Sequence, residues 1–286
     1  MLKTTIPPRV FCLLALALAA AAAAPAARAQ TPDQTLAALA RAAQPDWSSP
    51  LVTTSALLEQ RLRLDPQVQH SGNGSSTVNL DGGKGIDVIV APAVELQIAA
   101  MPYEIRSGAG AFSGIGDWPA IRLKQLLASS PQSAANYVVS AWLQLQAPIG
   151  ARPVTSHALT LLPTIGGGKG FGPFVLQATL GMVLPTARQD VLGVQYLGNA
   201  ALQLHLGGLF WPQIEANAAQ FAFGQRDGKR QVMLTPGVVI GRFSLTRRLA
   251  ATIGAGYQVA LAPAYRPTPL LPAYDHAWIT TARLGF

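Results

Sequence analysis

From about residue 53 to the end of the chain, apolar and polar residues tend to alternate. In the last segment one face holds Trp278, Leu284 and the terminal Phe286, and the other holds Thr281 and Arg283. A period of two is typical of a strand, and an exposed aromatic end suits the closing strand of a transmembrane β-barrel. A final Phe after alternating apolar residues also resembles the signal by which outer-membrane proteins are inserted. The alternative is an ordinary edge strand that ends in Phe.

The alternation predicts an all-β fold, an antiparallel transmembrane β-barrel of about twelve strands, with ten or fourteen as alternatives. Its even count puts both chain ends on the periplasmic side. Turns are predicted at Gly166–Gly170 and Gly207–Gly208, and longer extracellular loops at 106–114 and 264–273. The predicted strands cover 58–64, 77–90, 94–103, 116–128, 137–148, 158–165, 174–184, 194–206, 210–221, 231–243, 248–262 and 276–286.

Composition favours a barrel over a helical membrane protein or a soluble sandwich. Half of the residues are apolar, yet after the first 30 residues no apolar run is long enough for a membrane helix. Charged residues make up 12% of the chain, against about 25% in globular domains. A soluble sheet needs more charges on its outer face, whereas the outer face of a barrel contacts lipid. Outer-membrane lipid is therefore an expected partner, in the envelope of a Gram-negative bacterium.

The first 29 residues form a predicted secretory signal peptide. Lys3 and Arg9 precede an apolar run, and cleavage is expected between Ala29 and Gln30. Residues 30–50 are predicted as a periplasmic lead, a short helix or disordered, and residues 51–286 as the barrel. The single cysteine, Cys12, lies in the signal, so disulfides and thiol chemistry are excluded from the mature chain.

Polar residues on the predicted inner faces are the candidate lumen lining. Arg or Lys at the midplane of the lipid face would cost about 2–4 kcal/mol, so their inward position is already required for stability. If the lumen is open, its basic residues would favour anions slightly; these are Arg61, Arg63, Arg122, Lys124 and Arg283. The full set of candidates is Glu59, Arg61, Arg63, Glu95, Arg122, Lys124, Gln144, Gln177, Gln203, Glu215, Asn217, Gln258 and Arg283.

The sequence favours a small-solute channel or transporter over two alternatives, a structural or adhesive barrel and an outer-membrane hydrolase. Among the histidines only His205 falls on a predicted polar face, and no Gly-x-Ser-x-Gly or His-Glu-x-x-His motif occurs. No enzyme activity, metal or cofactor is expected. Removing Lys3, Arg9 and Arg28 from the 21 basic residues leaves 18 against 13 acidic ones, scattered in an exported chain, which argues against nucleic acid.

Five segments resemble one family of outer-membrane proteins. They are Val78–Gly85, Gly114–Trp118, Gly168–Gly172 with Gln177–Gly181, Phe210–Glu215 and Leu234–Gly241. In this order, together with Phe286, they resemble the outer-membrane transporter family of the MetA-pathway of phenol degradation type, over residues 50 to 286. The resemblance implies a barrel that takes up small solutes, including aromatic or anionic compounds. A monomer and the barrel-insertion machinery as a partner are expected.

Overall fold

The structure is a computed structural model that describes residues 35–80, 84–108, 111–152, 154–246, 249–262 and 274–286. The predicted signal peptide, its cleavage site at Ala29 and Gln30, and the predicted loop 264–273 lie outside the described residues. Among the described residues, no helix is both long and apolar enough to cross a lipid bilayer.

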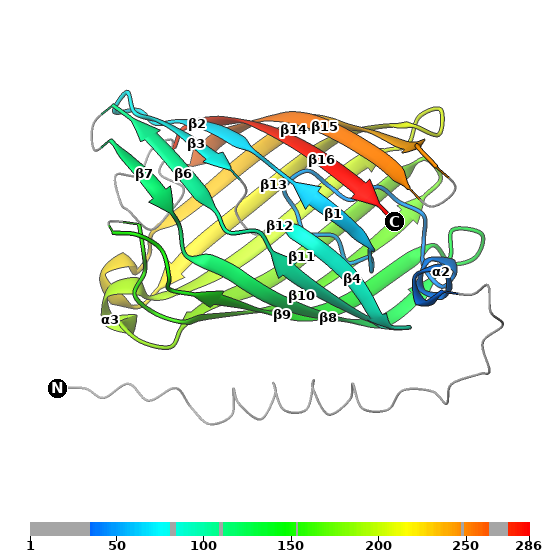
Figure 1. The fold of residues 1–286 in the computed structure, drawn as a ribbon, viewed down its shortest axis with the longest axis horizontal. Coiled ribbons are helices and arrows are strands. Elements are labelled where there is room, and N and C mark those ends of the chain that lie inside the picture. Colours follow the sequence, from blue (N-terminus) through cyan, green and yellow to red (C-terminus); the bar gives the residue numbers. More distant parts are fainter. Residues whose placement is uncertain (1–34, 81–83, 109–110, 153, 247–248, 263–273) are drawn as a thin grey trace. The chain divides into compact units, whose positions relative to one another are not determined.

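Within the described residues, sixteen strand segments join into one antiparallel sheet that closes on itself (Figure 1). Four wall strands each consist of two segments, so the barrel has twelve strands, as the sequence predicts. Pro66 and Pro102 lie in two of the gaps between paired segments, where a residue without an N–H does least harm to the ladder. The two-segment strands are β1 (Arg61–Leu64) with β2 (Gln67–His70), β3 (Ser76–Leu80) with β4 (Gly85–Ala91), β5 (Val94–Ala99) with β6 (Tyr103–Ser107), and β7 (Phe112–Ile115) with β8 (Trp118–Ser130).

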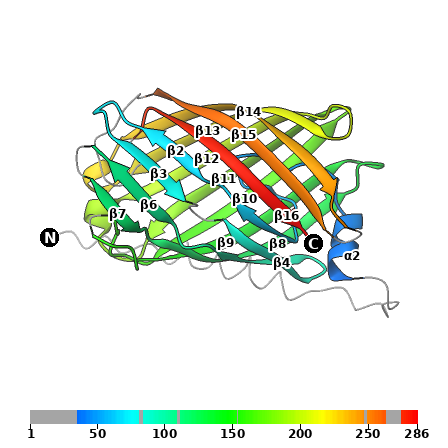
Figure 2. The ribbon, with the colours of Figure 1, turned by 45° about the horizontal axis from the view of Figure 1, so that its top comes forward.

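The remaining strands are continuous, and each pairs with its neighbours in chain order. The barrel closes where β16 pairs with β15 on one side and with β1 and β2 on the other, for example Leu284 with Leu62 (Figure 2). Closure leaves neither first nor last strand as a free edge. The continuous strands are β9 (Tyr137–Ala147), β10 (Thr160–Phe171), β11 (Phe174–Pro185), β12 (Val194–Leu204), β13 (Phe210–Ala222), β14 (Arg230–Ser244), β15 (Ala250–Ala262) and β16 (His276–Gly285).

In the part of the chain that the structure describes, three short helical elements lie outside the strands of the wall. Helix α2 (Leu36–Ala42) lies at the end of the barrel where β16 ends, here called the C-terminal mouth. Helix α3 (Gln189–Leu192) and the 3-10 helix η1 (Gly224–Arg226) lie in the loops at the opposite mouth (Figure 1). The buried face of α2, formed by Ala37 and Ala40, packs against Leu58 and Ile89 and so covers part of the C-terminal mouth.

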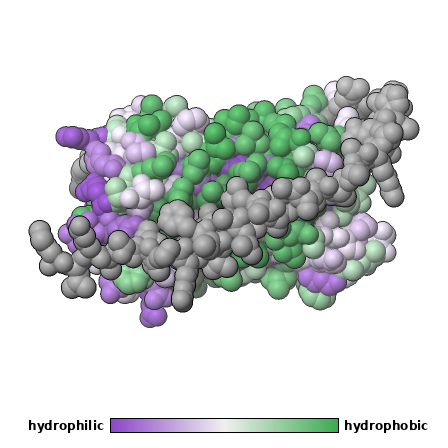
Figure 3. Space-filling view, turned by 90° about the horizontal axis from the view of Figure 1, so that it is seen from below, coloured by the Kyte–Doolittle hydropathy of each residue, from purple (hydrophilic) through white to green (hydrophobic). Residues whose placement is uncertain are grey.

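The outer face of the wall is apolar in a band between the two mouths (Figure 3). Large apolar side chains are exposed on nearly every strand, including Leu123 on β8, Leu176 on β11 and Trp278 on β16. Along the same strands the alternate side chains are buried polar groups such as Lys124, Gln177 and Arg283. An apolar outer belt around a polar interior is the pattern of a membrane barrel and the reverse of a soluble one.

Two local predictions are wrong. Gly166–Gly170 is not a turn but part of β10, and the chain reverses instead at Gly172-Pro173, between the paired residues Phe171 and Phe174. The first wall strand begins at Arg61. Leu58, which alternation within the predicted strand 58–64 places on the lipid face with Leu62, is only 3% exposed and lies inside. A third difference is the predicted loop 106–114, which is shorter because β6 runs to Ser107 and β7 begins at Phe112.

Candidate functional site

The lumen is occupied by residues 43–60, here called the plug. This segment leaves α2 at the C-terminal mouth, runs inside the barrel without helix or strand, and joins β1 (Figure 1). Trp47, Leu51, Ala56 and Leu57 are at most 3% exposed. Irregular backbone at membrane depth is tolerated only where other parts of the protein satisfy its N–H and C=O groups. The wall supplies these partners.

Glu215 on β13 binds the middle of the plug. Its carboxylate, which is fully buried, accepts hydrogen bonds from the backbone N–H groups of Leu51 (2.7 Å), Val52 (3.0 Å) and Thr53 (2.6 Å). The side-chain amide of Gln213 donates a further bond of 2.8 Å to the same carboxylate. Hydrogen bonds to an ionised acceptor are about twice as strong as neutral ones, so this carboxylate is the strongest single acceptor for the plug backbone.

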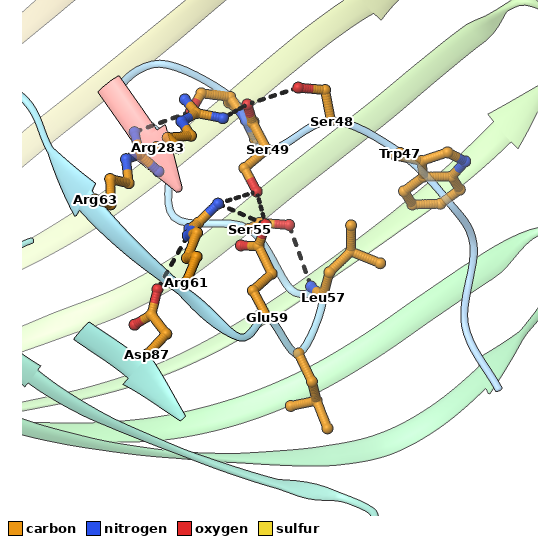
Figure 4. Close-up of polar contacts among 12 residues, drawn as sticks. Trp47, Ser48, Ser49, Ser55, Leu57, Glu59, Arg61, Arg63, Asp87 and Arg283 are labelled. Carbon is orange, nitrogen blue, oxygen red and sulfur yellow. Dashed lines mark hydrogen bonds and ion pairs between the residues drawn. The ribbon is translucent and has the colours of Figure 1, made fainter. Parts of the chain in front are cut away.

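Two arginines bind the carbonyl groups of plug residues 49–51, next to the N–H groups that Glu215 binds. Arg283 on β16 donates to the carbonyl oxygens of Ser49 (2.6 Å) and Pro50 (2.7 Å). Arg63 on β1 donates to those of Pro50 (3.1 Å) and Leu51 (2.6 Å). Figure 4 shows both guanidinium groups directed at the plug from adjacent strands. The plug is thus held through its backbone on both sides, N–H groups by Glu215 and C=O groups by arginine.

The final part of the plug binds the wall of β5, β8 and β9. Lys124 Nζ donates to the Leu57 carbonyl (2.8 Å) and Ser140 Oγ to the Ala56 carbonyl (2.5 Å). The Glu59 N–H donates to Glu95 Oε2 (2.7 Å). Buried hydrogen bonds of this kind specify one position of a chain segment. The three bonds therefore fix where the plug joins the first wall strand.

Apolar contacts position the plug in the lumen, and glycines of the wall leave room for its large side chains. Trp47 and Leu51 pack in one cluster with wall residues such as Trp211 and Val239. A Cβ atom added at Gly237 would lie 2.4 Å from Leu51 Cδ1, and one at Gly168 would lie 2.7 Å from Trp47 Cζ3. The Cβ at Gly237 would also lie 2.8 Å from the Ala255 carbonyl oxygen, so the backbone of β15 as well as the plug favours glycine there.

The basic residues of the lumen are largely paired with carboxylates. Arg61 pairs with Asp87 and Glu59, at 3.1 and 2.5 Å, and Lys124 pairs with Glu95 at 2.9 Å. Arg63 pairs with Asp65 at 2.7 Å, and Arg122 lies 3.4 and 3.5 Å from Asp87 and Glu95. Partners of opposite charge cancel most of the field that the basic residues would otherwise exert on an ion.

The thirteen candidates from the sequence have three kinds of surroundings. Nine of them contact the plug or belong to it: Glu59, Arg61, Arg63, Glu95, Lys124, Gln177, Glu215, Asn217 and Arg283. The bond of Asn217 is the longest of these, at 3.3 Å to Thr53 Oγ1. Arg122, Gln203 and Gln258 are buried and bonded to other wall residues, and Gln144 is half-buried on β9.

The sequence does not indicate the plug or several of its wall partners. Ser140 and Arg242 donate to plug carbonyls and Gln213 donates to Glu215, but none of the three stands out from the other polar residues of its strand. Among the residues that the structure describes, no three His, Cys, Asp or Glu side chains are grouped so as to hold a metal ion. His205 stacks on Trp211 with ring centroids 4.0 Å apart, and so supports the wall near the plug.

Comparison with known proteins supports the architecture. The chain is similar to an outer-membrane channel of the COG4313 group from Pseudomonas putida F1, with a TM-score of 0.53 and 13% identity over 83% of this chain and 98% of that one. The fold is that of an outer-membrane β-barrel. A porin named NanC aligns with a TM-score of 0.48 and 9% identity over 78% of this chain and 98% of that one. No family model and no curated protein matches the sequence, so the family resemblance stays a prediction.

The protein therefore resides in the outer membrane of a Gram-negative bacterium. Single-chain barrels with an even number of strands and an apolar outer belt are built for that membrane. A bilayer around the band in Figure 3 covers the exposed leucines, isoleucines and aromatic side chains of the wall.

Proposed function

We propose that the protein is an outer-membrane channel for small solutes, held shut by its own N-terminal plug. The observation that carries the proposal is that the lumen is filled by one chain segment bound through its backbone to polar wall side chains. Without residues 43–60, those same side chains would line a polar passage, which is how a solute pore is built. A twelve-strand barrel is wide enough to pass small solutes once it is cleared.

Two further observations support this proposal. The similar Pseudomonas putida protein is described as an outer-membrane channel. The resemblance to the transporter family of the MetA-pathway of phenol degradation type favours small aromatic or anionic solutes. The pairing of the lumen charges supports a weaker preference for anions than the count of basic residues suggests.

The proposal includes how the chain is delivered and oriented. Residues 1–29 would be removed as a signal peptide, and the insertion machinery would recognise Phe286, leaving a monomer with the C-terminal mouth in the periplasm. Residues 30–50 would enter from that side. Of this lead, the structure describes α2 at the mouth and residues 47–50 inside the lumen. The plug could then be displaced toward the periplasm without breaking any wall pairing.

A structural role is the second candidate function, because a barrel that transports no solute also needs a closed lumen. Solute uptake into liposomes separates the two. We expect the intact mature chain to admit small sugars slowly, and a chain lacking residues 36–58 to admit them on the order of ten times faster. Circular dichroism and resistance to denaturation confirm that the shortened barrel has folded. A folded shortened barrel that stays impermeable would instead establish the structural role.

A further inference from the structure

A cavity of about 320 Å³ opens at the C-terminal mouth, beside the plug rather than within it. Its described walls come from α2, both ends of the plug, Thr246 and Leu249 between β14 and β15, and the end of β16. This volume is at the low end for ligand pockets. Leu58, Ile89 and Leu249 give it an apolar side, and the rest of its lining is mainly polar.

Among the described residues, four arginines and two carboxylates line this cavity. Arg61 pairs with Glu59, and Arg242 forms an ion pair with Asp46. The other two, Arg41 and Arg283, have no carboxylate within ion-pair distance among the described residues. The cavity therefore has two positive charges more than its own lining neutralises.

The two surplus arginines differ in how they are held. Arg283 is fixed by its bonds to the carbonyls of Ser49 and Pro50 and by a bond from Nε to Thr281. These bonds use three of its five N–H groups, so two remain for a ligand. Arg41 is exposed on the last turn of α2, where its long side chain can reach a ligand.

We propose that this cavity binds a small, doubly charged oxyanion, with a carboxylate or phosphate group between Arg41 and Arg283. Guanidinium groups bind both kinds of anion through paired hydrogen bonds, and a dianion matches the surplus of two charges. A bound anion would join α2 and the plug to β16 and hold the plug in its seat. The site does not depend on the proposed channel activity.

Binding is tested with the full mature chain in uncharged detergent at low salt, by titration calorimetry with sodium succinate and, separately, sodium phosphate. We expect at least one of the two to bind, and R41Q to weaken that binding about ten-fold, the effect of one charge-assisted contact. Succinate alone would identify an organic dicarboxylate, and phosphate alone a phosphate ligand. Arg41 is exposed, so its substitution leaves the fold unchanged.

Two further variants show whether binding depends on the charge of this cavity. Ser244 lines the same cavity, and S244E should weaken binding at least as much as R41Q, because it adds a negative charge there. Arg152 is an exposed arginine in the loop after β9 at the opposite mouth, and R152Q should bind as the unaltered chain does. Absence of binding by both anions, or equal binding by the unaltered chain and R41Q, would overturn the proposal.

Discussion

Replacing Glu215 with alanine is expected to open the barrel. In planar bilayers, Glu215→Ala should raise the ratio of open to closed time on the order of 100-fold. The substitution leaves the N–H groups of Leu51, Val52 and Thr53 without their acceptor inside the lumen. A hydrogen bond to a charged group contributes about 1.5–3 kcal/mol, and each 1.4 kcal/mol changes an equilibrium ten-fold. The loss of two of the three bonds at the lower value already gives a change of this size.

Glu104→Ala is the matched control. Glu104 is a half-buried carboxylate on β6 whose ion-pair partner is Arg106, 3.8 Å away, and no contact joins it to the plug. Its removal should leave the open fraction unchanged. Glu215→Gln should fall between the two, because the amide oxygen can still accept from the plug but carries no charge. Equal open fractions for all variants and the unaltered chain would mean that Glu215 does not hold the lumen shut.

A disulfide between plug and wall should close this opened variant again. Thr53→Cys and Asn217→Cys, added to Glu215→Ala, place two thiols where Thr53 Oγ1 and Asn217 Nδ2 lie 3.3 Å apart. A disulfide needs Cβ atoms about 3.5–4.5 Å apart, a separation that two side chains in direct contact can reach. We expect oxidation to remove at least nine-tenths of the open time and a reductant to restore it.

The single-cysteine chains give the control for the disulfide. Glu215→Ala with only Thr53→Cys, or only Asn217→Cys, should conduct alike before and after oxidation. Cys12, the only natural cysteine, lies in the predicted signal peptide and is replaced by serine in all of these chains. If the oxidised double-cysteine chain forms the bond but conducts as well as the reduced one, the open path does not pass the plug.

The alternation of residues was enough to predict the wall. It gave twelve strands, because an apolar side chain facing lipid and a polar one facing the lumen leave the same period in every strand. Trp142 shows how far this holds. Strict alternation within the predicted strand 137–148 places this large apolar ring on the inner face, and the ring is 8% exposed inside the barrel.

The alternation of apolar and polar residues did not predict the plug, which contacts protein on all sides. Leu58 and Glu59 continue the pattern of β1, so the sequence predicts a strand there, yet both lie in the plug. A segment inside a polar lumen also mixes apolar and polar residues, and its period does not reveal which side faces the wall. Glu215, whose carboxylate accepts a hydrogen bond from the Leu51 N–H, lies 164 residues further along the chain, so no local pattern of the sequence could indicate this contact.

The glycines of β10 show the same limit. Gly166–Gly170 suggests a turn because glycine is common in turns. In the barrel these residues belong to a strand, and the space beside Gly166 and Gly168 is filled by Trp142 and Trp47. Glycine is needed at Gly166 for the approach of a side chain on the neighbouring strand, and at Gly168 for the approach of the plug, and neither contact can be seen in the local sequence.

The most direct test of the filled lumen is thiol accessibility at one buried and one exposed position. Ala56 is 1% exposed within the plug, whereas Ala38 is exposed on α2. With Cys12 replaced by serine, a membrane-impermeant maleimide should label Ala38→Cys quickly and Ala56→Cys about 100-fold more slowly, as expected when labelling must wait for a rare opening. Equal labelling rates at the two positions would contradict a plug seated in the barrel.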